Sequence, residues 1–260
     1  MIVTLTTDFG PGDYLAAMKG VILGIDPKAT IVDLDHSVRP QDVRQGAYSL
    51  FAATPFFPFA IHVGVVDPSV GTDRRPVAFV CEKGILVGPD NGLLVPAAGR
   101  LGMRQVRHLT NRTLFRPDVS DTFHGRDLFA PVAGHLSKGV EPTSLGPVIK
   151  DYVPLDFGAP KLTKSEARGS VLAVDRFGNV ITNIPRAEVE RRARFGDTLH
   201  VQVGGYEVDL PLETTYGRAR PWEFLATFSS SGFLEIARRE ARAADQLGAT
   251  PDTPVAVRFR

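Results

Sequence analysis

The stretch AIHVGVV at residues 60–66, followed directly by Asp67, decides the fold. Nearly every residue of this run is apolar, and its length is that of a strand rather than a helix. A strand without polar alternation is typical of a parallel sheet whose two faces are both covered by helices. The run therefore predicts a buried central strand that ends in a carboxylate.

The segments around this strand alternate between strand and helix signals. We predict further strands over residues 2–7, 30–35, 76–81 and 84–88, and helices over residues 14–23, 42–53 and 126–136. Such alternation indicates an N-terminal α/β domain, residues 1–155, with a mostly parallel sheet between helices. No G-x-G-x-x-G follows the first strand, so the usual dinucleotide-binding fingerprint is missing.

The rest of the chain is different in character. A segment rich in Pro and Gly predicts a linker over residues 156–167, and a C-terminal β-barrel-like domain follows over residues 168–260. We expect its strands over residues 169–175, 179–183, 199–203, 206–210, 224–228 and 255–259. One helix is expected among them, over residues 234–246.

The composition excludes several classes of protein. The 260 residues carry 30 basic and 29 acidic side chains, so no overall charge favours nucleic acid or an anionic membrane. The single cysteine, Cys81, excludes an internal disulfide. No apolar run approaches the ~20 residues that span a bilayer, and no secretion signal is apparent. We expect a cytoplasmic protein that binds neither nucleic acid nor membranes.

Three residues of the first domain could handle a water molecule. Asp67 ends a strand, Arg74 or Arg75 follows seven or eight residues later, and His124 precedes the glycine before a predicted helix. An aspartate, an arginine and a histidine together can hold a water, orient it and accept its proton. Each residue alone is equally well explained as a turn, surface or structural residue. Asp8, at the end of the first strand, could accept the hydroxyl protons of a ribose or could simply form a turn.

The second domain offers two further candidates. Asp175, Phe177 and Asn179 lie within five residues and could bind an amino group and stack on a flat ring. An ordinary β-turn explains the same pattern. Ser230 and Ser231 precede the predicted last helix, where they could hold a carboxylate at its N-terminus or could merely cap it.

Six motifs in order along the chain resemble one known family, the S-adenosylmethionine (SAM) hydroxide adenosyltransferases. These enzymes are the hydrolase branch of the family that includes the SAM-dependent fluorinase and chlorinase. The motifs are TTDFG (6–10), VDPSVGT (66–72), PDNGLL (89–94), TFHGRD (122–127), DRFGN (175–179) and SSG (230–232).

The resemblance implies both a fold and a reaction. It implies an α/β domain, a C-terminal β-barrel domain and a homotrimer, with the substrate between the N-terminal domain of one subunit and the C-terminal domain of the next. Its reaction splits SAM with water into adenosine and L-methionine. No cofactor or metal is implied, because SAM itself is the substrate.

The resemblance also implies roles for individual residues. Asp67, Arg74 and His124 would form the water-handling set, with Arg74 preferred to Arg75 because of its seven-residue offset from Asp67. The substrate-binding residues would be Asp8 for the ribose, Phe177 and Asn179 for the adenine, Asp175 for the methionine amino group, Ser230 and Ser231 for its carboxylate, and Phe123.

Two alternatives remain at this point. A SAM-dependent halogenase would share the scaffold, but the fluorinase has tyrosine in place of Asp67, serine in place of Gly125 and arginine in place of Ser231. An anionic carboxylate beside a halide would be repulsive, so Asp67 favours water. A nucleoside-binding protein without turnover would need Asp8, Phe177 and Asn179, but it would not need the Asp67, Arg74 and His124 set.

Overall fold

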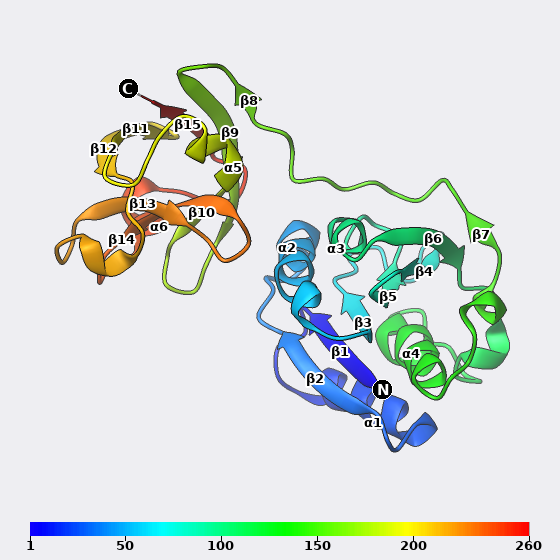
Figure 1. Ribbon diagram of the computed structural model, residues 1–260. Helices are drawn as coiled ribbons and strands as arrows, with labels where there is room; N and C mark the ends of the chain where they lie inside the picture. Colours follow the sequence, from blue (N-terminus) through cyan, green and yellow to red (C-terminus); the bar gives the residue numbers. More distant parts are fainter. Residues whose placement is uncertain (260) are drawn as a thin grey trace. The chain divides into compact units, whose positions relative to one another are not determined.

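The chain divides between Asp156 and Phe157 into two units, each built around its own sheet (Figure 1). The computed structural model describes residues 1–259. The segment from which we predicted a linker, residues 156–167, contains the two-residue strand β8 (Lys161–Leu162) and the start of β9.

The first unit alternates strands with helices as the sequence predicts. Its strands are β1 (Ile2–Thr7), β2 (Thr30–Asp35), β3 (Ala60–Val65), β4 (Pro76–Cys81), β5 (Gly84–Pro89), β6 (Met103–His108) and β7 (Val148–Ile149). Its helices are α1 (Asp13–Ile25), α2 (Val43–Ala53), α3 (Val95–Arg100), the π-helix η3 (Gly125–Phe129) and α4 (Ala130–Ser137), with short 3₁₀ turns η1 (Thr54–Phe56), η2 (Arg112–Leu114) and η4 (Pro142–Leu145).

These strands form one seven-stranded sheet in the order β2-β1-β3-β5-β4-β6-β7. The pairs β2–β1, β1–β3 and β3–β5 are parallel, whereas β4 runs antiparallel to β5 and β6, and β7 antiparallel to β6. Five strands therefore share one direction, which confirms the predicted mostly parallel sheet. As the run at residues 60–66 predicts, β3 is central and all six of its residues are buried.

Helices cover both faces of this sheet (Figure 1). Apolar side chains of α1 and α4, such as Met18 and Phe129, pack with β1 and β3 in one core cluster. On the other face, α2 approaches the sheet at Gly64, where an added Cβ would lie 2.9 Å from Leu50 and 3.0 Å from Leu94. The glycine in the middle of β3 thus permits close helix packing, and its cost to the strand is offset by the contact it allows.

The second unit consists mainly of antiparallel strands. These are β8, β9 (Glu166–Val174), β10 (Val180–Pro185), β11 (Thr198–Val203), β12 (Tyr206–Pro211), β13 (Phe224–Phe228), β14 (Phe233–Arg238) and β15 (Pro254–Arg258). They are accompanied by the short helices α5 (Arg186–Glu190) and α6 (Ala243–Leu247) and the 3₁₀ turn η5 (Tyr216–Arg218).

The eight strands form a nearly closed barrel. The sheet order is β12-β11-β15-β9-β10-β14-β13, with β8 added on β9. Its two end strands approach each other through a bridge between Leu212, just after β12, and Ala226 of β13, and Glu213 N donates to Ala226 O at 2.8 Å. The sheet encloses a single apolar cluster, so the predicted barrel-like domain is confirmed.

The predicted helix over residues 234–246 is wrong. Residues 233–238 form strand β14 between β10 and β13, and only Ala243–Leu247 are helical. Leu234 and Ile236 face the barrel core, while Ala237 packs on the other side with Ala219 and Leu225. Because the strand is buried on both faces, its apolar run lacks the alternation that identifies strands.

Ser230 and Ser231 do not cap a helix, because the segment that follows them is a strand. Residues 229–232 form the turn between β13 and β14, where Ser229 N donates to Phe233 O at 2.9 Å and Gly232 has φ 86°. Among residues 1–259, no helix is long and apolar enough to cross a membrane.

Candidate active site

Two carboxylates lie at the carboxyl edge of the parallel strands. Asp8 follows β1 and Asp67 follows β3 after one further residue, and the two strands are direct neighbours with Thr7 opposite Val65. This is the edge where open α/β sheets bind their ligands. A cleft of about 320 Å³ opens here, lined by residues of four segments: Asp8, Phe9, Pro40, Gln41, Val65, Asp67, Pro68, Val70, Thr122, Phe123, His124 and Gly125.

Arg74 connects Asp67 to His124. Its Nε lies 3.0 and 2.9 Å from the two Asp67 carboxylate oxygens, and its Nη2 lies 2.5 Å from Oδ2. The same Nη2 donates to His124 Nδ1 at 2.7 Å. The side chains of Arg74 and Asp67 are 6% and 5% exposed. The structure therefore brings the three water-handling candidates together, with the arginine in the middle.

The cleft is lined by Asp67 and His124, whereas Arg74 lies behind them. Arg74 is absent from the residues that form the cleft surface, and its guanidinium carbon lies 5.4 Å from the centroid of the Phe129 ring. Its Nη1 is buried without a hydrogen-bond partner. Arg74 thus orients the other two residues, while Asp67 and His124 face the space that a ligand would occupy.

The protonation of His124 follows from its partner. A guanidinium only donates hydrogen bonds, so His124 Nδ1 must be the acceptor and must lack a proton. Burial lowers the pKa of His124 below its ordinary value, and the positive charge of Arg74 lowers it further, against the opposing effect of Asp67. At neutral pH the ring is therefore neutral, and its proton is on Nε2.

Arg75 has a different task from Arg74. It donates to Asp90 Oδ2 at 3.0 and 2.8 Å and to both Asp151 carboxylate oxygens at 3.1 Å. Asp90 in turn accepts from Val153 N at 2.8 Å. Adjacent residues of an extended chain point in opposite directions, so one arginine faces the cleft residues and the other holds the segment after β7.

Aromatic rings form one wall of the cleft. The rings of Phe9 and Phe123 are 5.9 Å apart, and Tyr14 packs edge-on against Phe123 at 5.0 Å. A Cβ added to Gly125 would lie 3.3 Å from Phe123 and 3.5 Å from Phe9. Gly125 therefore lies close against these rings, and a serine there would require them to shift. On the opposite side, Asp8 Oδ2 accepts from Gln41 N at 2.8 Å, which leaves Oδ1 available to a ligand.

The second unit has a pocket of its own, of about 620 Å³. Its lining residues come from the β9–β10 turn, η5 and the segment after β14: Asp175, Arg176, Phe177, Asn179, Tyr216, Arg238, Arg239, Glu240, Ala241 and Arg242. Three candidates from the sequence therefore meet here. The Phe177 ring is 76% exposed, so it is available for stacking.

Asp175 organises the turn that carries the other two residues. Its Oδ1 accepts from Phe177 N at 2.9 Å and Asn179 N at 2.8 Å, and its Oδ2 accepts from Asn179 Nδ2 at 2.9 Å. The Asn179 amide is thereby oriented, with its nitrogen committed to Asp175. The turn interpretation is confirmed, because Asp175 forms an Asx-type turn that carries the ring and the amide beside the pocket. The binding of an amino group and a flat ring stays a prediction.

Ser230 and Ser231 lie elsewhere in the second unit. They belong to the turn before β14, whereas Arg238, at the other end of that strand, lines the pocket. The structure does not bring these serines to Asp175, Phe177 and Asn179.

Sequence reasoning missed a buried pair beneath this pocket. Glu235 of β14 is only 3% exposed, and its Oε1 accepts a hydrogen bond from the Tyr216 hydroxyl at 2.6 Å. Burial raises the pKa of Glu235, and the nearby charge of Asp175 raises it further, against the effect of Tyr216. A carboxylate within the apolar run Phe233–Ala237 was the available signal, because charged residues are rarely buried without a partner.

Metal-binding side chains do not gather in either unit as far as residue 259. No three His, Cys, Asp or Glu side chains there come together in an arrangement that could hold a metal ion.

Both units match the same protein family. Residues 3–146 match the SAM hydroxide adenosyltransferase N-terminal domain, and residues 169–256 match the SAM hydroxide adenosyltransferase C-terminal domain. The chain belongs to the SAM hydroxide adenosyltransferase family. The resemblance carried by the six sequence motifs is thus confirmed.

Individual relatives agree with this family. The chain is 41% identical to the (R)-S-adenosyl-L-methionine hydrolase of Salinispora tropica over 96% of this chain and 94% of the relative. It is 36% identical to the protein of the same name from Methanocaldococcus jannaschii, over 91% and 88%. The fluorinase of an Actinoplanes species is more distant, at 28% identity over 92% and 91%.

A solved structure shares the whole architecture. The crystal structure of an uncharacterized conserved protein from Thermotoga maritima superposes with a TM-score of 0.94 at 35% identity and covers 99% of both chains. Both the α/β unit and the barrel unit thus recur in a relative.

Proposed function

We infer that this protein is an enzyme that hydrolyses S-adenosyl-L-methionine to adenosine and L-methionine, by attack of water at C5′ of the ribose. The observation that carries this inference is the Asp67–Arg74–His124 set at the carboxyl edge of the sheet. The relatives named as hydrolases at 36–41% identity support it. Their names specify the R configuration, so we propose that this chain also acts on the R epimer at sulfur.

The chemistry makes few demands on the protein. The sulfonium already makes C5′ electrophilic, and it leaves as a neutral thioether that needs no proton. The enzyme must hold a water oxygen in line with the C5′–S bond, about 3–3.5 Å from the carbon. It must also receive a proton as the new C–O bond forms, because free hydroxide is scarce at neutral pH. We propose that neither step uses a cofactor or a metal.

The geometry suggests how the three residues divide this work. His124 Nδ1 is occupied by Arg74, so His124 offers its Nε2–H as a donor to the water oxygen. Asp67 accepts hydrogen bonds only, and it is the group that takes the water proton. Arg74 keeps both side chains in place and is a positioning residue. This assignment supplies a donor and an acceptor to one water molecule.

Other residues of the two pockets would hold the substrate. We propose that Asp8 accepts the ribose hydroxyls with its free Oδ1, and that Phe123 and Gly125 line the space for the reacting carbon. Phe177 and Asn179 would contact the adenine. On the resemblance alone, we propose that Asp175 contacts the methionine amino group and that Ser230 and Ser231, in the separate turn before β14, contact its carboxylate.

A homotrimer is part of this proposal. The water-handling groups and the adenine-binding candidates lie in pockets of different units. We propose that sites form where subunits meet, each using the first unit of one subunit and the second unit of the next. Analytical ultracentrifugation should then show a trimer, and a stable monomer with full activity would contradict it.

The decisive experiment incubates the purified protein with each sulfur epimer of SAM in H₂¹⁸O and identifies the products by mass spectrometry. We expect adenosine with ¹⁸O at the 5′ position, plus unlabelled methionine, from the R epimer. A 5′-halo-5′-deoxyadenosine that appears only with added chloride or fluoride would identify a halogenase instead. Substrate that binds but stays intact would identify a binding protein.

Variants test the roles of the two cleft residues. We expect Asp67→Asn and His124→Ala to lower kcat by about 10²–10⁴-fold, the usual contribution of a positioned proton-transfer group, with little change in SAM affinity. Asp73→Asn is the matched control, because Asp73 is an exposed acid in the same loop. Equal losses in turnover and in substrate affinity would contradict the assignment to the water.

A further inference from the structure

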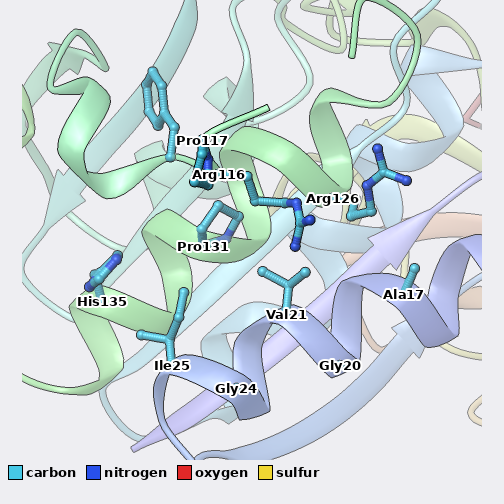
Figure 2. A pocket seen from close by; sticks show the side chains of 11 residues that line it. Ala17, Gly20, Val21, Gly24, Ile25, Arg116, Pro117, Arg126, Pro131 and His135 are labelled. Carbon is cyan, nitrogen blue, oxygen red and sulfur yellow. The ribbon is translucent and has the colours of Figure 1, made fainter. Parts of the chain in front are cut away.

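A second cavity lies in the first unit, apart from the cleft. It has a volume of about 560 Å³, within the range of small-molecule pockets, and it lies between α1, the loop after η2, the π-helix η3 and α4 (Figure 2). Its lining residues are Ala17, Gly20, Val21, Gly24, Ile25, Phe115, Arg116, Pro117, Arg126, Pro131 and His135. None of them lines the cleft that holds Asp67 and His124.

One side of this cavity is cationic. Arg116 extends toward α1 in Figure 2, Arg126 lies beside it among the lining residues, and both pair with the fully buried Asp127. Arg126 uses Nε and Nη2 on this carboxylate, at 2.6 and 2.9 Å, while Arg116 uses its Nε at 3.3 Å. Both terminal nitrogens of Arg116 and Nη1 of Arg126 are therefore left to donate elsewhere. Two guanidiniums against one carboxylate leave one positive charge in excess.

The side of the cavity formed by α1 is apolar, and two glycines of this helix leave open space there. Gly20 and Gly24 lie one turn apart on α1, flanking Val21 (Figure 2). A Cβ at either glycine would meet nothing within 4 Å, and neither has a positive φ. Glycine inside a helix costs about 0.5–1 kcal/mol relative to alanine. Neither backbone conformation nor close packing accounts for these two glycines, and their effect is to leave space in front of the arginines.

The remaining lining residues limit the class of ligand that the cavity could bind. Phe115, Pro117, Val21, Ile25 and Pro131 offer apolar contacts, and no acidic residue lines the cavity. A zwitterion such as an amino acid would find no partner for its ammonium group. A neutral ligand would leave the arginine donors unpaired.

We propose that this cavity binds a small carboxylic acid with an apolar body. The carboxylate receives hydrogen bonds from Arg116 and Arg126, which present planar donor groups suited to it. The apolar body lies along α1 over Gly20, Val21 and Gly24. This site is additional to the proposed hydrolase site and does not depend on it.

The cavity is connected to the cleft through the π-helix. Arg126 N and Asp127 N both donate to Phe123 O, and the Arg126 guanidinium carbon lies 5.0 Å from the centroid of the Phe123 ring. His124 and Gly125 of the cleft directly precede Arg126. A carboxylate bound to Arg126 would therefore contact the residue that directly follows Gly125, a lining residue of the cleft.

Titration calorimetry of the full chain with hexanoate tests the proposal, with hexanamide as the isosteric neutral probe. We expect hexanoate to bind at least about tenfold more tightly than hexanamide, because hydrogen bonds to a charged group are stronger than those to a neutral one. Arg116→Gln should weaken hexanoate binding by at least about tenfold. Arg104→Gln is the control, since Arg104 is an exposed arginine of β6 that does not line the cavity and pairs with Glu82.

A second variant tests the apolar part of the site. Gly24→Leu fills the cavity from α1 without a clash, and it should abolish hexanoate binding while leaving the protein folded. Gly99→Leu, at another helical glycine with open space around it, is the matched control and should bind as the wild type does. Absence of hexanoate binding to the wild type would overturn the proposal. So would equal binding of the amide, unchanged binding in Gly24→Leu, or inorganic phosphate binding as tightly as hexanoate.

Discussion

Each unit of the chain buries a carboxylate beside its pocket, and the two carboxylates are balanced in different ways. In the first unit, Asp67 pairs with the guanidinium of Arg74 through two nitrogens. In the second unit, Glu235 has the neutral hydroxyl of Tyr216 as its partner. The first is a charge matched by a charge, whereas the second is an acid whose pKa burial has raised.

This difference shows what each pocket can do. The ion pair with Arg74 links Asp67 to His124 through one shared guanidinium. A buried acid with a phenol partner contributes shape and a hydrogen bond, because its ionised form is disfavoured. In the proposed mechanism the proton transfer therefore takes place in the first unit.

The largest effect should come from removing the cation in the first unit. We expect Arg74→Gln to lower kcat by at least about 10²-fold, and to cost about 3–5 kcal/mol of stability because it leaves Asp67 as an unpaired buried charge. The double variant Arg74→Gln/Asp67→Asn should regain much of the stability but none of the activity. Urea denaturation and a product assay measure both. Full activity in Arg74→Gln would show that turnover does not need a charged partner for Asp67. The proposed functional difference between Asp67 and Glu235 would then be wrong.

The next effect concerns a buried histidine in the same unit. His62 of β3 is fully buried with Nδ1 2.8 Å from Thr4 Oγ1, and burial lowers its pKa from 6.5 to about 4. The unfolded state therefore binds the proton more readily, so stability is lost as the pH falls from about 6.5 to 4. We expect His62 to account for a loss of about 3 kcal/mol over that window.

Urea denaturation at several pH values, compared with His62→Gln, isolates this contribution. The variant should show a flatter dependence between pH 6.5 and 4 than the wild type does. Parallel curves for the wild type and His62→Gln would show that His62 does not titrate as its burial requires.

A smaller effect is expected in the second unit. Tyr216→Phe removes the only hydrogen bond to Glu235 Oε1 in the described structure, which should cost about 1–3 kcal/mol at neutral pH. Tyr206→Phe is the control, because Tyr206 is an exposed tyrosine of β12. Equal stability of the two variants would mean that the Tyr216–Glu235 bond contributes nothing.

The smallest effect has the opposite pH sign to that of His62. Because the pKa of Glu235 is raised in the folded state, its contribution to stability is present below about pH 4.5 and is lost as the pH rises. We expect Glu235→Gln, which keeps an acceptor for Tyr216, to raise the Tm at pH 8 and to leave it unchanged at pH 4. A lower Tm at pH 8 would show that the ionised carboxylate stabilises the fold.

The first unit was the more predictable of the two. Its strands are long apolar runs, and its acids follow those runs directly, so Asp8 and Asp67 could be placed on one edge from sequence order. In the second unit the predicted helix at β14 was wrong. Leu234 and Ala237 are buried on opposite faces of one strand, and their spacing of three residues is also that of a helix face. The helix start expected just after Ser230 and Ser231 was wrong for the same reason.

The sequence by itself determined the α/β and barrel architecture, the family, and the identity of the residues at the strand ends. These depend on local periodicity and on motifs that lie along the chain. Only the tertiary structure decided that Arg74 stands between Asp67 and His124, that Tyr216 covers Glu235, and that Gly20 and Gly24 face two arginines. Those contacts join residues far apart in the chain, and their energies arise from burial and from partners that sequence spacing does not specify.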